Sequence, residues 1–259
     1  MSRIHPSAAV APGAELDPDV EIGPGAVIGP RVRIGARTTI GAHTVIDGWT
    51  EIGSDNQISP HVVLGTPPQD LKYRDEPTRL VIGDRNRIRE FVTIHRGTPQ
   101  GRGVTRIGSD VFLMAYSHLA HDNVVEDHVV VANGAQVGGH VELGAHAILG
   151  GCSAVHQFVR IGAHAFVGGG SVVVMDVAPF CRASGNRARL FGLNGIGLRR
   201  RGFTAADLRA VGAAYRLLFG SNLLLSEAAA RIEQELLPKC PKLEALLVFV
   251  RSSQRGLTR

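Results

Sequence analysis

Several histidines and one aspartate recur at a regular spacing in the middle of the chain, and their side chains could carry out acid–base chemistry. His121 directly precedes Asp122, and His118 lies three residues earlier. Steps of eighteen residues from this segment lead to further polar or small residues, namely Gly139, His140, His156 and Gln157, with His95 on the other side. Because imidazole titrates near neutral pH, a histidine beside a carboxylate can act as a general base with its own orienting group.

The activation of a hydroxyl group is the chemistry that suits this cluster. A hydroxyl is a poor nucleophile near neutral pH and needs a base at hydrogen-bond distance. His121 is a candidate for that base, and Asp122 would stabilise the imidazolium that forms. Gly139, without a side chain, would leave a backbone N–H accessible to a developing oxyanion. The alternative is a ladder of surface histidines with no chemistry, and the clustering favours a site.

Histidine clusters can also hold zinc, as in the γ-class carbonic anhydrases, which use a related architecture. That family's motif of two histidines separated by four residues is missing from the central cluster. His118 and His121 have only two residues between them. We therefore expect no metal.

A six-residue repeat predicts the elements that must position these side chains. Aliphatic residues occupy every sixth place from Ile4 to Leu64, resume from Ile82 to Ile94, and continue after a slip of one residue from Ile107 to Val173. This period is typical of a parallel β-helix, in which each hexad forms one flat face of a triangular coil. The repeat predicts about nine to ten coils and a prism roughly 45 Å long. Glycines that follow the aliphatics, such as Gly35 and Gly53, are expected at tight corners.

Two stretches interrupt the hexads, and both are predicted to be external loops. They cover residues 66–80 and 96–105. Loops on a rigid scaffold often carry function. The first contains a dense polar group, Gln69, Asp70 and Lys72, which favours a functional role.

The repeat ends near Pro179, and a helical pattern follows. We expect a β-helical domain over residues 1–186 and a helical domain over 187–259. Thr204 and Ser226 are predicted N-caps, and Pro241 is predicted to open a third helix. From Arg187 onward the chain has thirteen Lys and Arg against five Asp and Glu, a net charge of +8, whereas the rest has fifteen against eighteen, a net charge of −3. A basic end could meet an acidic partner or phosphates, or could simply be a solvated surface.

Composition excludes several classes of protein. There is no apolar run of membrane-spanning length and no basic-then-apolar leader, so no stable membrane insertion is expected. The three cysteines, Cys152, Cys181 and Cys240, show no metal-binding spacing and favour a reducing, cytoplasmic environment. We expect no nucleic-acid partner.

Six short segments carry a resemblance to one family. They are Gln-Asp-Leu-Lys-Tyr (69–73), Ile-Gly-Asp-Arg-Asn-Arg-Ile-Arg-Glu (82–90), Val-Thr-Ile-His-Arg-Gly-Thr (92–98), His-Leu-Ala-His-Asp (118–122), Ala-Val-His-Gln-Phe (154–158) and Arg-Arg-Gly-Phe (200–203). With them, the chain resembles the acyl-carrier-protein-dependent UDP-N-acetylglucosamine O-acyltransferases, which start lipid A synthesis, essentially from end to end. The resemblance implies a left-handed coil, a homotrimer with sites between subunits, an acyl donor carried on acyl carrier protein, and no metal or nucleotide cofactor.

The resemblance also implies roles for individual residues. His121 resembles the general base, Asp122 its orienting carboxylate and Gly139 the oxyanion donor. Positions that match sites for UDP-N-acetylglucosamine and the acyl thioester are Asp70, Lys72, His118, His140, His156, Gln157, Asn194, Arg200 and Arg201. Gly169 matches the floor of the acyl pocket, where a glycine implies a long 3-hydroxyacyl chain. The chain departs from the family at Ile196, often acidic, and at Arg187, often histidine.

Three alternatives remain open at the level of the sequence. The first is the N-acyltransferase of the same pathway, which usually carries an added N-terminal domain, whereas the hexads here begin at Ile4. The second is a γ-class carbonic anhydrase, and the third is a β-helix that only binds. A transferase assay and a metal assay separate them.

Overall fold

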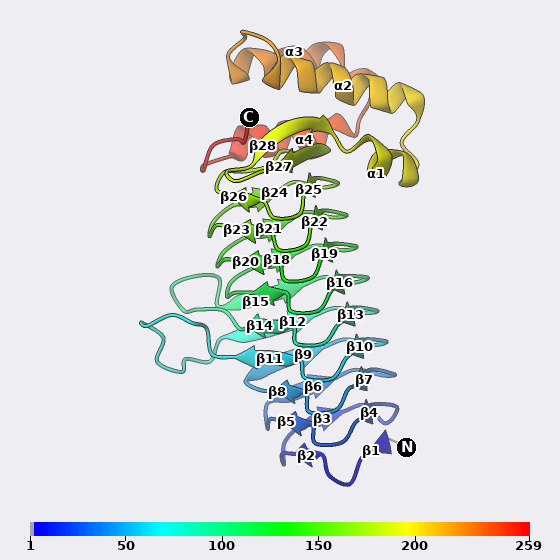
Figure 1. Cartoon of the computed structure of the whole chain (residues 1–259), viewed down its shortest axis with the longest axis vertical. Helices are drawn as coiled ribbons and strands as arrows, with labels where there is room; N and C mark the ends of the chain where they lie inside the picture. The colour runs from blue at the N-terminus through cyan, green and yellow to red at the C-terminus, as the bar shows by residue number, and fades with distance from the viewer. Residues whose placement is uncertain (1–2) are drawn as a thin grey trace.

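Short parallel strands stack into a three-sided prism, which a group of helices closes at one end (Figure 1). The computed structural model describes residues 3–259. The prism is a left-handed parallel β-helix, as the hexad repeat and the resemblance together predict. Successive strands belong to different sheets, and in the regular coils each pairs with the strand three places further along the chain.

The three sheets contain eleven, nine and eight strands. The first consists of β1 (Arg3–Ile4), β4 (Glu21–Ile22), β7 (Thr39–Ile40), β10 (Gln57–Ile58), β13 (Arg87–Ile88), β16 (Phe112–Leu113), β19 (Val130–Val131), β22 (Ile148–Leu149), β25 (Phe166–Val167), β27 (Cys181–Ser184) and β28 (Arg189–Leu193). The second consists of β2 (Ala9–Val10), β5 (Val27–Ile28), β8 (Val45–Ile46), β11 (Val63–Thr66), β14 (Thr93–His95), β17 (His118–Leu119), β20 (Gln136–Val137), β23 (Ala154–Val155) and β26 (Val172–Val173). The third consists of β3 (Glu15–Leu16), β6 (Val32–Ile34), β9 (Trp49–Ile52), β12 (Arg79–Ile82), β15 (Val104–Ile107), β18 (Val124–Val125), β21 (Glu142–Leu143) and β24 (Arg160–Ile161).

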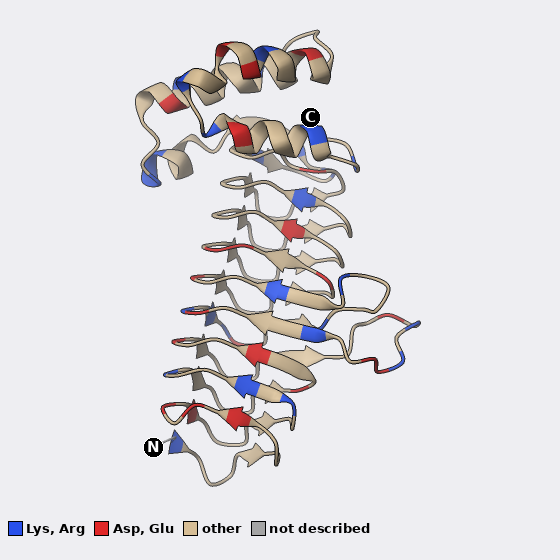
Figure 2. Ribbon diagram, turned by 180° about the vertical axis from the view of Figure 1, so that it is seen from behind, with Lys and Arg blue, Asp and Glu red and all other residues tan. Residues whose placement is uncertain are grey.

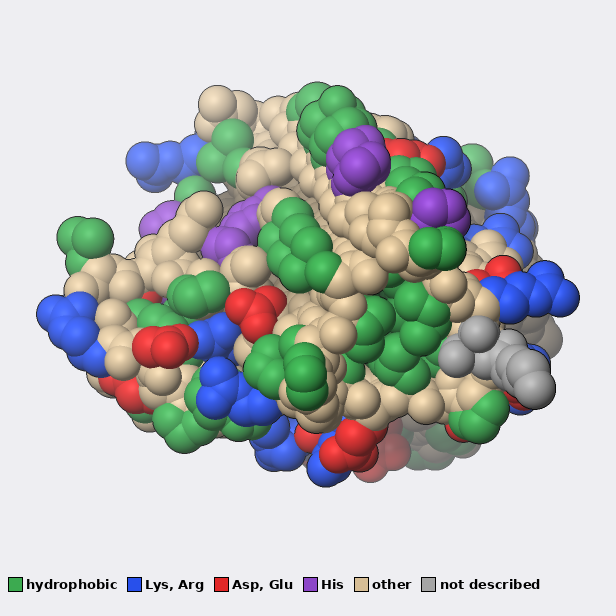
Figure 3. Space-filling model, turned by 90° about the horizontal axis from the view of Figure 1, so that it is seen from below, with side chains coloured by type: hydrophobic (Ala, Val, Ile, Leu, Met, Phe, Trp, Pro, Cys, Tyr) green, Lys and Arg blue, Asp and Glu red, His purple; other side chains and the backbone are tan. Residues whose placement is uncertain are grey.

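The hexad aliphatics form the core, as their spacing predicts. Ile22 pairs in register with Ile40, and Leu119 with Val137, so each inward side chain stacks on its equivalent in the next coil. These residues are almost completely buried. The first coil is the exception, because Ile4 remains 40% exposed at the open end of the prism. Figure 3 looks onto this end and shows apolar side chains within it.

Several strands of the third sheet carry charged residues, and near the N-terminal end of the sheet acidic and basic residues follow one another on successive strands (Figure 2). Arg33 on β6 pairs with Glu15 on β3 at 3.0 Å, and Arg79 on β12 approaches Glu51 on β9 to 3.6 Å. Residues eighteen apart, or further apart where a loop intervenes, face each other directly in such a stack. Opposite charges therefore meet across neighbouring strands.

The sequence predicts glycine at the tight corners, but the corner residues with a left-handed backbone are usually of another type. The residue in the left-handed region lies three places after the inward aliphatic and is usually not glycine, as at Asp55 (φ 60°) and His140 (φ 60°). Aspartate and histidine tolerate this region better than most residues. Gly35, which directly follows an aliphatic, has no positive φ. It is small for another reason: a Cβ there would lie 2.8 Å from the carbonyl carbon of Gly53 in the next coil.

Two long connections project from one corner of the prism, where the sequence predicts external loops (Figure 1). The first, residues 67–78, joins β11 to β12, and the second, residues 96–103, joins β14 to β15. Apart from these insertions the coils keep the eighteen-residue spacing as far as β26, whereas the last coil is shorter and Phe166 pairs with Arg182.

The segment after the prism begins with a strand. The expectation of helix immediately after Arg187 is wrong for residues 189–193, because β28 pairs antiparallel with β27. The expected boundary at 186/187 falls in the turn of this hairpin. The helices are α1 (Gly195–Arg200), α2 (Ala205–Phe219), α3 (Leu225–Glu235), a 3-10 turn η1 (Leu237–Lys239) and α4 (Leu243–Ser252).

The predicted caps are partly confirmed. The Thr204 hydroxyl accepts a hydrogen bond from the Asp207 N–H at 3.1 Å and caps α2. Ser226 is not a cap: α3 begins two residues earlier than that prediction requires, with Leu224 at the N-cap. Glu227 accepts the Leu224 N–H at 2.9 Å instead, so the carboxylate rather than the serine hydroxyl satisfies the first turn.

The C-terminal segment folds back on the last coils. Asp176 donates its N–H to the Gly256 carbonyl, and its carboxylate accepts from the Ser253 hydroxyl at 2.8 Å. Arg160 on β24 reaches the Ser252 hydroxyl at 3.0 Å and lies over the ring of Phe249 on α4. Within residues 3–259, none of the helices is both long and apolar enough to cross a bilayer.

Candidate active site

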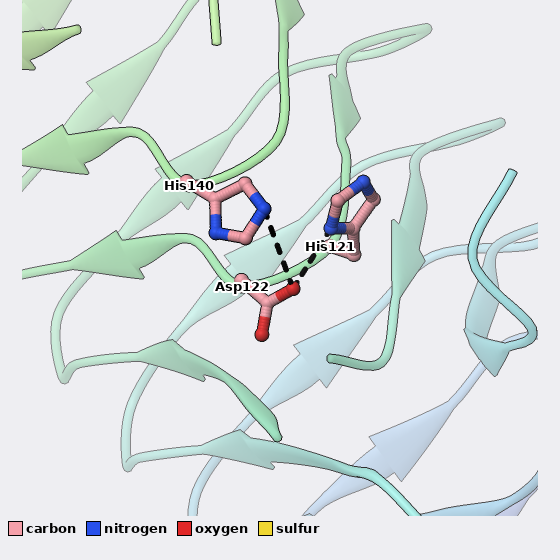
Figure 4. Close-up of side chains that lie close together, drawn as sticks. All are labelled: His121, Asp122 and His140. Atoms are coloured by element: carbon pink, nitrogen blue, oxygen red, sulfur yellow. Dashed lines mark hydrogen bonds and ion pairs between the residues drawn. The ribbon is translucent and has the colours of Figure 1, made fainter. Parts of the chain in front are cut away.

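The side chains of His121 and Asp122, which are adjacent in the sequence, contact each other at one corner of the prism (Figure 4). The Nδ1 atom of His121 lies 2.8 Å from Oδ2 of Asp122. Since a carboxylate can only accept, Nδ1 carries the hydrogen and Nε2 is left with a free lone pair. The His121 side chain is 16% exposed and Asp122 is fully buried. The pair therefore has the geometry of a base and its orienting carboxylate.

The Asp122 carboxylate is held by several donors besides His121. Oδ2 accepts from the Thr98 hydroxyl at 2.6 Å, and Oδ1 accepts from the Arg102 N–H at 2.8 Å. Burial alone would raise the pKa of this carboxyl, but the hydrogen bonds from His121 and Thr98 outweigh burial and lower it. Asp122 is accordingly an anion beside His121 at neutral pH.

Gly139 lies directly against the His121 ring. A Cβ at position 139 would be 2.7 Å from Cε1 and 2.8 Å from Nε2 of that imidazole, so only glycine fits. Gly139 is itself buried. Its backbone N–H is less accessible than the sequence predicts, because the His121 imidazole covers the residue. Within the described residues its N–H donates to no acceptor, although its carbonyl accepts from Phe158 at 3.0 Å. A free N–H thus lies beside the candidate base.

His140 forms the second wall of the site. Its ring packs edge-on against His121, with centroids 5.0 Å apart, and stacks on Phe158 at 4.4 Å. Its Nε2 lies 3.9 Å from Oδ2 of Asp122. Burial lowers the pKa of His140, with a smaller opposing effect from Asp122 and a minor one from Asp70. A neutral His140 can donate or accept a hydrogen bond at the mouth of the site.

His121, Asp122 and His140 also have the spacing of a three-ligand metal group. The chemistry of the set argues against a metal. Oδ2 of Asp122 already accepts from His121 Nδ1, the Thr98 N–H and the Thr98 hydroxyl, so few lone pairs remain for an ion. The arrangement suits proton transfer better than metal binding.

His95 and His118 form a second histidine pair, one coil nearer the N-terminus than the pair of His121 and His140. His118 shares a hydrogen bond with the Thr93 hydroxyl at 2.7 Å, and its ring packs edge-on against His95. Burial lowers the pKa of His118 and brings that of His95 to about 4. Both imidazoles are therefore neutral at physiological pH, and they extend the polar wall beside His121.

The remaining ladder residues lie on the exposed side of the corner. His156 is exposed, and its Nδ1 is 2.9 Å from a guanidinium nitrogen of Arg255. Gln157 is exposed next to it. A cavity of about 680 Å³ lies beside His140. Its lining includes three arginines and two carboxylates, namely Arg102, Arg160, Arg255, Glu142 and Asp176. This side of the corner therefore opens onto a recess of mixed charge, in which Glu142 pairs with Arg102 and Arg160.

Asp70 and Lys72 lie on the loop of residues 67–78, which is anchored by a buried arginine. Arg96 is 2% exposed; its Nε donates to the Tyr73 hydroxyl at 2.8 Å and its Nη1 to the Gly65 carbonyl at 3.0 Å. Its third nitrogen forms an ion pair with Asp75. Arg96 thus ties the loop that carries Asp70 and Lys72 to the coil that carries His95.

Asn194, Arg200 and Arg201 lie near a different corner from His121. Asn194 caps α1 by accepting the Gly197 N–H at 3.2 Å, and its amide donates to the His164 carbonyl. His164 belongs to a stack of corner histidines, with His146 4.8 Å away. The charge of Arg201 contributes, after burial, to the lowered pKa of both imidazoles. Within one chain these residues do not join the His121 site.

Gly169 and Arg187 lie close to the end of the prism and are both exposed. A Cβ at Gly169 would be 3.2 Å from the Gly151 carbonyl oxygen, so one methyl group just fits. At Gly168 a Cβ would be 2.6 Å from the Ser184 hydroxyl. Gly169 is therefore exposed to solvent, whereas the backbone at Gly168 next to it is closely packed.

Sequence reasoning missed three residues of this site, Thr98, Arg102 and Arg96. All three lie in the loop of residues 96–103, which the hexad break marks as an insertion. The break in the hexad repeat marks the loop. It does not reveal that the loop contacts Asp122, which is twenty or more residues away in the chain. Only the folded coil brings the two together.

Comparison with known proteins agrees with this architecture. Residues 176–258 match the family model described as Udp N-acetylglucosamine O-acyltransferase, domain 2. The acyl-[acyl-carrier-protein]–UDP-N-acetylglucosamine O-acyltransferase of Burkholderia multivorans is 54% identical over 210 residues, which cover 79% of each chain. The solved structure of LpxA from Acinetobacter baumannii superimposes with a TM-score of 0.97 at 42% identity, and that from Moraxella catarrhalis with 0.96 at 45%, each over 99% of both chains.

The prism, the helical end and the histidine corner define a hexapeptide-repeat acyltransferase. Within that class, the Burkholderia multivorans relative and the Moraxella catarrhalis structure are both named as UDP-N-acetylglucosamine O-acyltransferases. The structure matches the prism as well as the helices. The chain belongs to the UDP-N-acetylglucosamine O-acyltransferase family.

Proposed function

We propose that this protein transfers a 3-hydroxyacyl chain from acyl carrier protein to the 3-hydroxyl of UDP-N-acetylglucosamine, the first step of lipid A biosynthesis. One observation carries the chemical part of the proposal: a buried, ionised Asp122 directs Nδ1 of His121 and leaves its Nε2 free. The family relationship supports the choice of donor and acceptor.

In the proposed reaction His121 takes the proton of the sugar hydroxyl while the oxygen attacks the thioester carbonyl. The imidazolium keeps its Nδ1–H bond to Asp122, which stays ionised. The carbonyl oxygen becomes an oxyanion, and the unpaired Gly139 N–H is the proposed donor to it. Collapse of the tetrahedral intermediate breaks the C–S bond, and the proton on His121 passes to the departing thiolate. No metal or further cofactor takes part in this scheme.

A homotrimer is part of the proposal. The proposed catalytic corner of one chain reaches the solvent through His121 and His140, whereas Arg200 and Arg201 lie near another corner, beside the His146–His164 stack. A neighbouring prism would bring its arginines to the His121 corner, where their guanidinium groups would suit the diphosphate of the nucleotide. The sugar would then contact Asp70, Lys72, His118, His140, His156 and Gln157, with Asn194 at the nucleotide end.

The acyl chain is proposed to run towards Gly169. This glycine leaves the surface open, and Arg187 lies near the same end of the prism. Acyl carrier protein is proposed as an acidic partner. Its proposed docking surface is the helical end, which has a net charge of +8 over residues 187–259. The unpaired Cys152, Cys181 and Cys240 support a reducing, cytoplasmic location.

A transferase assay tests the proposal. UDP-N-acetylglucosamine is offered with a panel of acyl carrier protein thioesters, and the product is analysed by mass spectrometry. We expect an O-acylated sugar nucleotide with a long 3-hydroxyacyl chain. Acylation only of an acceptor with an amino group at that position would identify the N-acyltransferase instead. Turnover lost on chelation and restored by zinc would indicate a metal enzyme.

A further inference from the structure

The loop of residues 96–103 wraps around the Asp122 carboxylate. Oδ2 accepts from the Thr98 N–H at 3.0 Å and from the Thr98 hydroxyl at 2.6 Å. Oδ1 accepts from the Arg102 N–H at 2.8 Å and from the Thr98 N–H at 3.2 Å. Three donors of one loop therefore converge on a single carboxylate, besides the one from His121.

The loop is also shaped and fastened for this contact. A Cβ at Gly101 would lie 2.5 Å from the carboxylate of Asp122, so the loop can close over it only with glycine there. The Arg102 side chain donates from Nη1 to the Asp122 carbonyl at 2.9 Å and pairs through Nη2 with Glu142 on β21. Its backbone and its side chain thus hold the same residue from two directions.

Other corner aspartates show what the loop adds. Asp55 and Asp110 have the same left-handed backbone as Asp122. Their side chains are 39% and 33% exposed, and each is paired with an arginine, whereas the Asp122 side chain is fully buried. A buried carboxylate is costly unless hydrogen bonds replace its water. At Asp122 the loop supplies those bonds without placing a competing cation against the carboxylate.

We propose that residues 96–103 form a positioning loop, in which Thr98, Gly101 and Arg102 hold Asp122 as an anion directed at His121. The inference rests on the proposed role of His121 as the base. With one Asp122 oxygen directed at Nδ1, the imidazole cannot turn and its Nε2 lone pair faces the substrate. Thr98 and Arg102 hydrogen-bond to Asp122, so the loop acts on His121 through that carboxylate.

Steady-state kinetics tests the role of the Thr98 hydroxyl. Thr98→Val keeps the shape but removes the O–H donor, and Thr98→Ser keeps the donor. We expect Thr98→Val to lower kcat at least about tenfold with KM for UDP-N-acetylglucosamine within about twofold, because the interaction matters mainly while charge develops on His121. Thr98→Ser should stay close to wild type.

Thr44→Val is the matched control. The Thr44 hydroxyl is equally buried and donates to the Ser59 carbonyl at 2.9 Å, in a coil that does not contact the site. It should lower stability without lowering kcat. Equal loss of kcat in Thr44→Val and Thr98→Val would show that only general stability is involved and would overturn the proposal.

A double-mutant cycle tests whether Thr98 acts through the base. In a His121→Ala background, Thr98→Val should cost little further activity, because residues of one catalytic unit are non-additive. A full additional tenfold loss would refute action through His121. Gly101→Ala provides a second route in case Thr98→Val does not fold: position 101 is exposed, and its methyl group should displace the loop and lower kcat by a similar factor.

A titration that needs no activity separates this inference from the proposed function. The carboxyl carbon of Asp122 is followed by NMR in the full-length protein with ¹³C-labelled aspartate, assigned with Asp122→Asn. Loss of a donor to the ionised form should raise its pKa in Thr98→Val but not in Thr44→Val. An unchanged titration in Thr98→Val would reject the loop's role. A shifted titration in a protein without transferase activity would keep that role and reject the function.

Discussion

Individual side chains gain their chemistry from the corner on which they lie. Asp122 and His140 both have left-handed backbones, with φ of 59° and 60°. This conformation turns the chain sharply, so His121 and Asp122 point towards the same space although they are neighbours in sequence. The same turn stacks His140 on Phe158 and leaves its edge facing His121.

At this scale the first prediction concerns the base. His121→Ala should lower kcat by about 10²-fold or more, because general-base catalysis is typically worth 10²–10⁴. The thermal midpoint should change little, since within residues 3–259 the His121 side chain makes its one hydrogen bond through Nδ1. Turnover and differential scanning fluorimetry measure the two quantities. Near wild-type turnover would exclude His121 as the base.

The second prediction concerns acid sensitivity. Burial, with smaller effects from His146 and Arg201, lowers the pKa of His164 from 6.5 to about 4. The unfolded chain therefore binds a proton that the folded chain refuses between these values, so stability should fall as pH drops from 6.5 to 4. His164→Phe, whose ring suits a stack with Phe180, should weaken this dependence.

Thermal melts across that pH range provide the measurement. His61→Phe replaces an exposed imidazole of another corner stack and is the matched control. It should follow the wild-type curve. An unaltered pH dependence in His164→Phe would place the acid-sensitive group elsewhere.

Among the structural elements, the loops depart furthest from what the sequence could predict. The hexads predict inward residues such as Ile22 and Leu149 and therefore the register of the sheets, because one coil repeats the next. They contain no information on what an insertion contacts. Arg96 reads as a surface arginine in sequence, yet it is buried among partners from two separate segments, β11 and the loop of residues 67–78.

The end of the repeat is unpredictable for a related reason. The strand β28 has no hexad, and its pairing depends on β27 being the last coil edge available. Ser226 has the residue type of a cap, but Glu227 can reach the Leu224 N–H and the helix begins earlier. In both cases tertiary contacts outweigh a local preference.

A third prediction tests the anchor of the first loop. Arg96→Met should free residues 67–78 and raise KM for UDP-N-acetylglucosamine several-fold, with a smaller effect on kcat, because Asp70 and Lys72 would lose their fixed position. Arg74→Met is the control, since that side chain is exposed and donates to the Leu71 and Tyr73 carbonyls of its own loop. Equal KM values in both variants would argue against the anchor.

A fourth prediction concerns acyl length. Gly169→Met should move the preferred donor to a shorter chain, since each methylene denied burial costs about 0.8 kcal/mol. Gly169→Ala carries the same close contact with the Gly151 carbonyl but no long side chain, so it should keep the parent profile. Competition among thioesters of different length measures both. An unchanged profile in Gly169→Met would direct attention to Arg187.

At the scale of the whole molecule, the separation of the two functional corners predicts shared sites. His121 lies at one corner and Arg201 beside another, so no single chain completes a site alone in the proposed trimer. Sedimentation should show a trimer at working concentration. Mixing His121→Ala with Arg201→Ala chains, each poorly active, should restore partial activity after subunit exchange. No recovery in trimers of confirmed mixed composition would contradict this arrangement.

The two ends of the prism are finished differently, and this gives the molecule a direction. The last coils are covered by β28, α4 and the segment around Gly256, whereas the first coil leaves Ile4 40% exposed. In a stack where each coil contacts only its neighbours, disruption begins at the uncovered end and advances one coil at a time. Asp122 lies several coils from that end. The blue end in Figure 1 can therefore unfold and refold locally and reversibly while the corner of His121 and Asp122 stays folded.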